Sequence, residues 1–210
     1  VGAFLFNNGI SNNLSFQETI SINSIDAPIY PRTGSHISLT LELTPPYSLF
    51  NDIDYSTASN AEKYKFIEYH KWKFSSSWFT KLAGNLVLNT KIQYGFLGLY
   101  NRELGASPYE RFYLGGDGLS GFSLDGREII ALRGYVNNSI TPQNDKGTPV
   151  GGTIFDKYTF ELRYPVSLNP SATIYFLTFA EAGNNWFNFK EFNPFSMYRS
   201  LGAGIRIFLP

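Results

Sequence analysis

The 210-residue chain contains no cysteine, which excludes a disulfide framework, a cysteine-based zinc site and a thiol nucleophile. Histidine is almost as scarce, because only His36 and His70 are present, and a histidine-rich metal site is therefore not expected. The 17 basic residues balance the 17 acidic ones, which leaves no net charge to attract nucleic acid. Neither a G-x-S-x-G nor an H-E-x-x-H motif occurs. We therefore expect no enzyme, no catalytic residues, no cofactor and no metal.

Long hydrophobic runs are also missing, since no stretch of 18 or more apolar residues would form a membrane-spanning helix. The chain is instead rich in aromatic residues, with 19 Phe, 14 Tyr and 3 Trp making 17% of it. Aromatic side chains favour half-buried strands, and Tyr and Trp favour interfaces between apolar and wet surroundings. A hydrophobic content of 43% excludes the composition of a disordered chain. Any membrane role must then belong to a β-barrel.

Apolar residues recur with a period of two along most of the chain. In His36–Thr44, for example, Ile37, Leu39 and Leu41 alternate with polar residues, as in a strand with one apolar face. We predict an all-β fold with no convincing helix. The expected strands are seven segments: Leu14–Asn23, His36–Thr44, Tyr64–Phe74, Asn85–Phe96, Tyr158–Tyr164, Ala172–Glu181 and Leu201–Leu209.

The connections between these strands alternate between short and long. Short turns are expected at Pro28–Ser35, Ser75–Gly84 and Pro165–Ser171, and long loops at Pro45–Glu62, Asn101–Gly152 and Gly183–Arg199. In an antiparallel sheet, this alternation places all long loops at one end, which is typical of an outer-membrane barrel. A soluble β-sandwich that binds carbohydrate through exposed aromatic side chains is the less favoured alternative.

Charged residues on the polar strand faces favour the barrel over the sandwich. Lys91, Glu161, Arg163 and Arg206 are too many charges for a tightly packed interior, whereas a wet lumen accommodates them. One strand departs from the pattern, because Glu68 and His70 fall on the aromatic face of Tyr64–Phe74. Either a bulge or a locally wet face would explain this departure.

The long loop carries the most specific motifs. It reads E-R-F-Y-L-G-G at Glu110–Gly116 and, after a glycine-rich insert, A-L-R-G-Y at Ala131–Tyr135. These segments resemble the BamA-type outer-membrane assembly factors of the bacterial surface antigen superfamily. There, an F-Y-x-G-G segment precedes an R-G-F/Y tip on an external loop that folds back into the lumen. Similar family motifs are found at Tyr30–Gly34, Phe160–Pro165, Phe179–Trp186 and Ser200–Pro210.

The resemblance implies a transmembrane antiparallel β-barrel. By this register, residues 1–210 are a fragment of the C-terminal half of a 16-stranded barrel, without its seam strands and without the POTRA domains. Residues 101–152 form the lumen-folding external loop. Its insert, Asp117–Ile130, departs from the compact form of the loop, and its path is not predicted.

The resemblance also assigns a site, in which the loop tip is latched to the barrel wall. For Arg133, the alternative is a solvated loop charge that binds nothing. For Glu161, the alternative is an ion pair with its neighbour Arg163 on the same strand. Glycines of the loop do not form a phosphate cradle, because no helix follows them. The expected latch motif is Arg133, Gly134 and Tyr135, its partners are Glu161 and Glu181, and the loop base motif is Phe112, Tyr113, Gly115 and Gly116.

The function implied by the resemblance is non-enzymatic insertion of nascent β-barrel proteins into the outer membrane of Gram-negative bacteria. The expected partners are nascent outer-membrane proteins, accessory assembly lipoproteins and outer-membrane lipids. A polypeptide-secreting pore or a translocation assembly protein of the same superfamily is the alternative.

Overall fold

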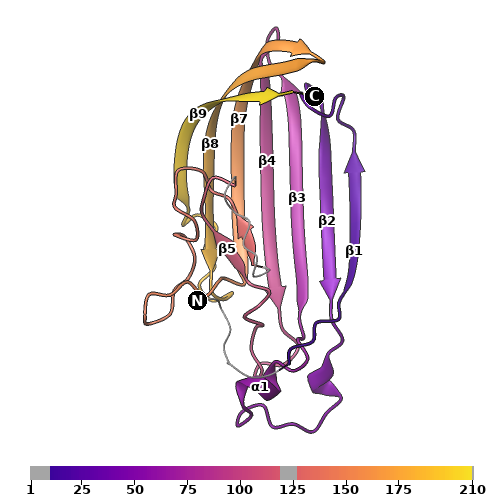
Figure 1. Cartoon of the computed structure of the whole chain (residues 1–210), viewed down its shortest axis with the longest axis vertical. Helices are drawn as coiled ribbons and strands as arrows, with labels where there is room; N and C mark the ends of the chain where they lie inside the picture. Colours follow the sequence, from indigo (N-terminus) through magenta and orange to yellow (C-terminus); the bar gives the residue numbers. More distant parts are fainter. Residues whose placement is uncertain (1–9, 119–126, 210) are drawn as a thin grey trace.

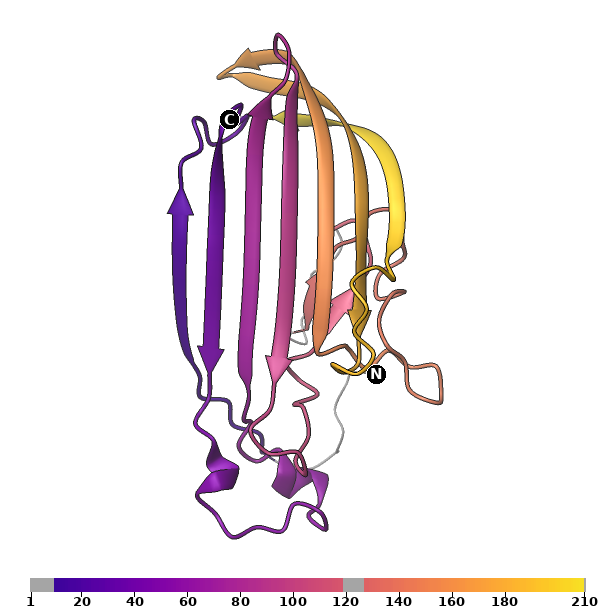
Figure 2. The same ribbon diagram turned by 180° about the vertical axis from the view of Figure 1, so that it is seen from behind.

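The computed structural model describes residues 10–118 and 127–209. Its main feature is a curved seven-stranded antiparallel sheet with the order β1-β2-β3-β4-β7-β8-β9 (Figures 1 and 2). The only other sheet in these ranges is a parallel pair in the long loop, β5 and β6. The predicted all-β class is confirmed. The strands are β1 (Phe16–Asn23), β2 (Gly34–Leu43), β3 (His70–Lys81), β4 (Val87–Gly98), β5 (Phe112–Leu114), β6 (Glu128–Ile130), β7 (Ile154–Asn169), β8 (Ala172–Trp186) and β9 (Tyr198–Phe208).

The two faces of the large sheet differ in polarity. Because side chains alternate along a strand, the register places Ile20, Leu39 and Phe74 in one row on the outer face. A row on the opposite face contains Lys91, Thr159 and Glu181. The long loop docks on this second face, which we call the inner face. The predicted separation of apolar and polar faces is therefore present in the structure.

The connections follow the predicted alternation in length. Residues 24–33, 82–86 and 170–171 connect the strands at one end, and residues 44–69, 99–153 and 187–197 connect them at the other. The strands β1 and β9 are the two edges of the sheet and do not pair with each other. Figure 1 shows the long connections at the lower end of the sheet and in front of β7 to β9.

Two short helical segments in loop 44–69 were not predicted. They are a 3-10 helix, η1 (Tyr47–Leu49), and a four-residue helix, α1 (Asn60–Lys63). The sequence signal for α1 is a capping box, in which the Ser59 side chain and the Glu62 backbone and side chain bond each other reciprocally. No helix among the described residues has the length and apolar character needed to cross a membrane.

The predicted bounds of the third strand were wrong. β3 spans His70–Lys81, so Glu68 lies before the strand and needs no bulge. Its carboxylate instead accepts hydrogen bonds from the backbone N–H (2.7 Å) and the hydroxyl (2.6 Å) of Ser48. The serine run at residues 75–77 looked like a turn but is strand, because each of these serines pairs with β2 and β4.

The predicted turn at Pro165–Ser171 was also too long. β7 continues through Pro165 to Asn169, and the register shifts between Pro165 and Ser167. Because proline cannot donate to the ladder, an irregularity at this position is the usual way to keep it inside a strand. The actual turn is confined to residues 170–171.

A tyrosine from a short turn packs across the inner face at that end of the sheet. The Tyr30 hydroxyl donates to the carbonyls of Arg163 (3.1 Å) and Asn85 (3.2 Å), which are both more than 50 residues away in sequence. Its ring packs edge-on against Tyr175 at a centroid distance of 5.0 Å, in a cluster that includes Val87. Tyr30 thus fixes the short turn against the opposite side of the curved sheet.

A lysine introduced on the outer face should destabilise the protein far more than a lysine introduced on the inner face. Leu39→Lys, on the outer face, is expected to cost about 2–4 kcal/mol in a bilayer, because a cation at the midplane loses its hydration. The neighbouring Ser38→Lys, on the inner face, is the matched control and should cost little. The measurement is the free energy of unfolding of the full chain from lipid vesicles in urea. Equal costs at the two positions would contradict the assignment of faces.

Candidate functional site

The loop base motif closes the long loop upon itself. The backbone N–H of Gly115 donates to the Ile130 carbonyl, and that of Gly116 donates to the Tyr135 carbonyl, both at 3.0 Å. The two glycines have φ values of 125° and 93°, which L side chains rarely adopt. A Cβ on Gly115 would also collide with the Val136 carbonyl oxygen. These glycines therefore hold the base next to the tip.

Phe112 and Tyr113 of the base motif lie in β5 and are almost fully buried. The Phe112 ring packs edge-on against Phe155 of β7 at 4.8 Å, and its carbonyl accepts a hydrogen bond from the Asn185 side chain of β8 at 2.7 Å. Gly152 exchanges two backbone hydrogen bonds with Phe112. The base of the loop is thus attached to β7 and β8 by both apolar and polar contacts.

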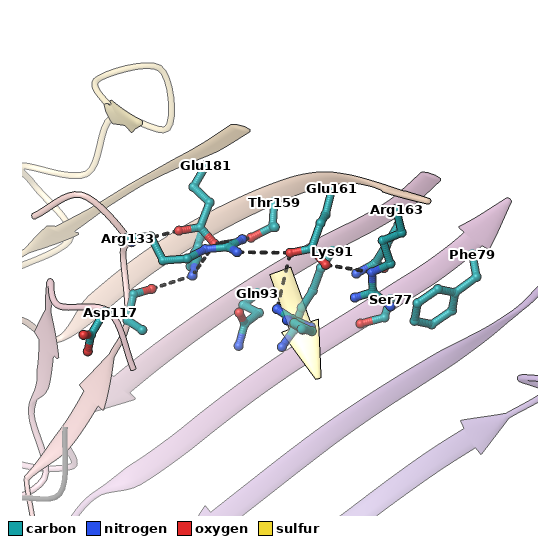
Figure 3. Close-up of a pocket in the computed structure, with 14 residues that line it drawn as sticks. Ser77, Phe79, Lys91, Gln93, Asp117, Arg133, Thr159, Glu161, Arg163 and Glu181 are labelled. Atoms are coloured by element: carbon teal, nitrogen blue, oxygen red, sulfur yellow. Dashed lines mark hydrogen bonds and ion pairs between the residues drawn. The ribbon is translucent and has the colours of Figure 1, made fainter. Parts of the chain in front are cut away.

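At the tip, Arg133 contacts two carboxylates of the inner face (Figure 3). Its Nη1 lies 3.1 Å from Glu161 Oε2, and its Nη2 lies 2.8 Å from Glu181 Oε1. Its backbone N–H donates to Glu181 Oε2 at 2.9 Å. The guanidinium also lies 3.6 Å from the centroid of the Phe179 ring. A planar fork that reaches two acceptors and stacks on a ring suits arginine and does not suit lysine.

The two carboxylates are shared with cations on the inner face of the large sheet, which we call the wall. Glu161 also accepts from Arg163 Nε at 2.7 Å and lies 3.4 Å from Arg206 Nη2. Glu181 also lies 3.0 Å from Lys157 Nζ. Both glutamate side chains are only 2% exposed. Each buried carboxylate therefore keeps a wall cation when the loop is absent, and Arg133 adds to an existing network.

The remaining two residues of the tip motif also contact the wall. The Tyr135 hydroxyl donates to the Arg199 carbonyl of β9 at 2.8 Å, and its ring packs edge-on against Tyr198. Gly134 has a φ of 87°, and a Cβ at this position would lie 3.3 Å from the Cβ of Ser200. The tip thus reaches three adjacent strands, β7, β8 and β9.

A cavity of about 340 Å³ adjoins this network on the inner face. Its lining carries charges of both signs, and the buried Asn89 leaves its Oδ1 without a hydrogen-bond partner. A cavity lined in this way has room and polar groups for water molecules beside the ion pairs. Residues that line it include Asn89, Lys91, Asp117, Arg133, Lys157, Glu161, Arg163, Glu181 and Arg206.

The structure brings Arg133 together with both expected partners, Glu161 and Glu181. Glu161 also pairs with Arg163, so the latch and the pairing within the strand are both present. The sequence reasoning missed Lys157 and Arg206 as further partners of the carboxylates. A signal for Lys157 was available, because it shares the strand parity of Glu161. Gly118 has a positive φ of 78°. Residues 119–126 of the insert, which include the further loop glycine Gly121, lie outside the described residues.

We predict that Arg133→Ala destabilises the docked loop by about 1.5–3 kcal/mol, the usual worth of hydrogen bonds to charged groups. The cost stays moderate because the wall cations continue to neutralise both carboxylates. Arg133→Lys should lie between wild type and alanine. The measurement is urea unfolding of the full chain, with Arg102→Ala as control, since Arg102 is an exposed arginine of the same loop without an ion pair among the described residues. A cost no larger than that of the control would refute the latch.

Glu161→Gln is predicted to cost more than Arg133→Ala, about 3–5 kcal/mol, because it removes the counter-ion of a buried cation. The Arg163 side chain is only 8% exposed, and Glu161 is its one acidic partner within 4 Å in the described part of the chain. The same unfolding measurement gives the ranking. If Glu161→Gln proved milder than Arg133→Ala, Arg163 would not depend on this carboxylate.

Comparison with known proteins agrees with this architecture. The chain is similar to the crystal structure of BamA from Haemophilus ducreyi lacking POTRA domains 1-3, with a TM-score of 0.62 and 15% sequence identity. The similarity covers 91% of this chain but only 35% of that one, so the chain spans about a third of that structure. No curated protein matches it. The Omp85 superfamily domain matches residues 6–210, and the chain therefore belongs to the Omp85 superfamily.

Proposed function

We propose that this chain is part of an outer-membrane barrel that helps nascent β-barrel proteins to fold and insert, and that it does so without enzymatic chemistry. The observation that carries the proposal is the docked R-G-Y loop on the inner face of an Omp85 domain, with Arg133 joining Glu161 and Glu181. The similarity in fold to a BamA barrel supports a role in outer-membrane protein insertion or translocation.

The physical need for such a protein is general. Hydrocarbon cannot satisfy unpaired backbone groups, so a strand entering a membrane needs a partner edge. An open barrel seam would provide that edge by strand addition. In this mechanism the client strands pair with the edge at the seam and do not cross the lumen. The loop can therefore stay docked in the lumen throughout. The partners proposed on this basis are nascent outer-membrane proteins, accessory assembly lipoproteins and outer-membrane lipids, with the protein resident in the outer membrane.

A secretion pore would use the same barrel differently. A polypeptide that crosses through the lumen must displace the loop from the inner face. The two functions therefore predict opposite effects of fixing the loop in place.

The chain offers a position for that test because it has no native cysteine. A Cβ on Gly134 would lie 3.3 Å from the Ser200 Cβ, just below the usual separation in a disulfide of about 3.5–4.5 Å. In the full-length protein, the oxidised Gly134→Cys/Ser200→Cys double variant is expected to retain insertion of client barrels into lipid vesicles. The reduced double variant is the control, since a cysteine at positive φ costs about 1–3 kcal/mol of strain in both states.

Loss of client insertion on oxidation, with recovery on reduction, would contradict assembly with a docked loop. Absence of client insertion in both states, with passage of a polypeptide that stops on oxidation, would favour the secretion pore. Each single-cysteine variant should behave alike under oxidising and reducing conditions. The assay reports client insertion, so it depends on function and not only on loop docking.

A further inference from the structure

We propose that a second charge clamp, formed by Lys71, Lys73, Glu110 and Glu128, positions the base of the long loop independently of the Arg133 tip. We call these four residues the base cluster. The two lysines lie on the inner face of β3. Glu110 precedes β5 and Glu128 begins β6, so both acids belong to the loop. Glu110 begins the E-R-F-Y-L-G-G segment, but the other three residues lie outside the sequence motifs, and none of the four belongs to the tip network.

The contacts centre on Lys71. Its Nζ lies 2.8 Å from Glu128 Oε2 and 3.4 Å from Glu110 Oε2, and its side chain is only 4% exposed. It also lies 4.8 Å from the centroid of the Phe112 ring. Lys73 Nζ lies 3.3 Å from Glu128 Oε1. A lysine this deeply buried needs its counter-ions, so the loop acids and the strand lysines require each other.

The two acids do not contribute equally. Burial raises the pKa of the Glu110 carboxyl in spite of the neighbouring Lys71. Burial also disfavours the charge of Glu128, but Lys71 and Lys73 outweigh it and lower the pKa of that carboxyl. Glu128 is therefore the main charged partner, and Glu110 is the secondary one.

Glu110 extends the cluster to two further external segments. Its Oε1 accepts from the Asn13 side chain at 3.0 Å, and the same amide lies within 3.3 Å of the Tyr69 hydroxyl. Tyr69 in turn donates to Glu42 at 2.6 Å. The segment before β1, loop 44–69 and the long loop thus meet at the base cluster.

The base cluster and the tip network have opposite polarity. At the tip a loop cation meets wall acids on β7 and β8, whereas at the base loop acids meet wall cations on β3. These anchoring strands lie on opposite sides of β4 in the sheet. A loop docked in the reverse direction would place like charges together at both ends. The pair of clamps therefore specifies how the loop lies across the inner face.

Limited trypsin digestion of the full-length protein tests the proposal, because cleavage reports how often each part of the loop opens. Trypsin cuts after arginine and lysine. Cleavage after Arg111 and Arg127 reports on the base and cleavage after Arg133 on the tip, and the exposed Arg102 and Lys146 of the same loop serve as reference sites. Lys71→Met keeps an apolar stem but removes the charge. We expect it to raise cleavage after Arg111 and Arg127 by about tenfold and to leave cleavage after Arg133 nearly unchanged.

Glu181→Gln should raise cleavage after Arg133 and leave cleavage after Arg111 and Arg127 nearly unchanged. In the Glu181→Gln/Lys71→Met double variant, cleavage at each site should rise as much as in the corresponding single variant, as expected for independent sites. Lys71→Arg, which keeps the charge, should restore protection of the base. Lys81→Met is the matched control, since Lys81 is an exposed lysine on the same face of the same strand.

Equal opening of base and tip in Lys71→Met, or a pattern no different from Lys81→Met, would overturn the proposal. If Lys71→Met did not fold, Glu128→Gln would give the same base-specific cleavage, and its absence would be equally decisive. The cleavage pattern measures docking and not client insertion. Its failure is therefore distinguishable from failure of the assembly function.

Discussion

Two carboxylates on the inner face, Glu161 and Glu181, determine much of how this protein is organised. Each is almost completely removed from solvent, where an unpaired charge would be very costly. The wall meets this requirement with Lys157, Arg163 and Arg206, and the loop adds Arg133. The polar inner face, the folded-back loop and the curved sheet that faces it are parts of one electrostatic arrangement. The outer face is mainly apolar, with Glu18 on the edge strand β1 as an exception, and most charges of the large sheet are gathered on the inner face.

The loop reaches these carboxylates only because its backbone takes conformations reserved for glycine. Gly115 and Gly116 bond the carbonyls of Ile130 and Tyr135, which brings the tip beside the base in spite of the intervening insert. Gly134 then allows the chain to pass close to Ser200. The glycine-rich composition of this stretch is therefore a consequence of its path and does not indicate a phosphate site.

The sequence predicted the architecture well because period-two patterns and loop lengths are local signals. It failed at Ser75–Ser77, which has the composition of a turn, and at Pro165, because long-range pairing overrode local preference there. Periodicity placed Glu161 on the inner face, but only the family resemblance connected it to Arg133. Lys71 and Glu128 were beyond prediction, since they are far apart in sequence and each alone resembles a solvated charge.

The distribution of apolar contacts distinguishes the two ends of the docked loop. Leu114, Leu132 and Ile140 form a core inside the loop itself, with the partly buried Ile130 and Tyr135 packed against it. The tip contacts the wall through ion pairs and hydrogen bonds, with the Arg133 guanidinium stacked on Phe179 and the Tyr135 ring against Tyr198. At the base, Phe112 packs against Phe155 of the wall in a buried cluster that also contains Ile67, Tyr69 and Leu97, so release there exposes a larger apolar surface. A buried ion pair is weak evidence for net stability, because desolvation offsets much of its attraction. We therefore infer that the tip network mainly selects the docked geometry, and that the apolar contacts at the base provide more of the free energy that holds the loop.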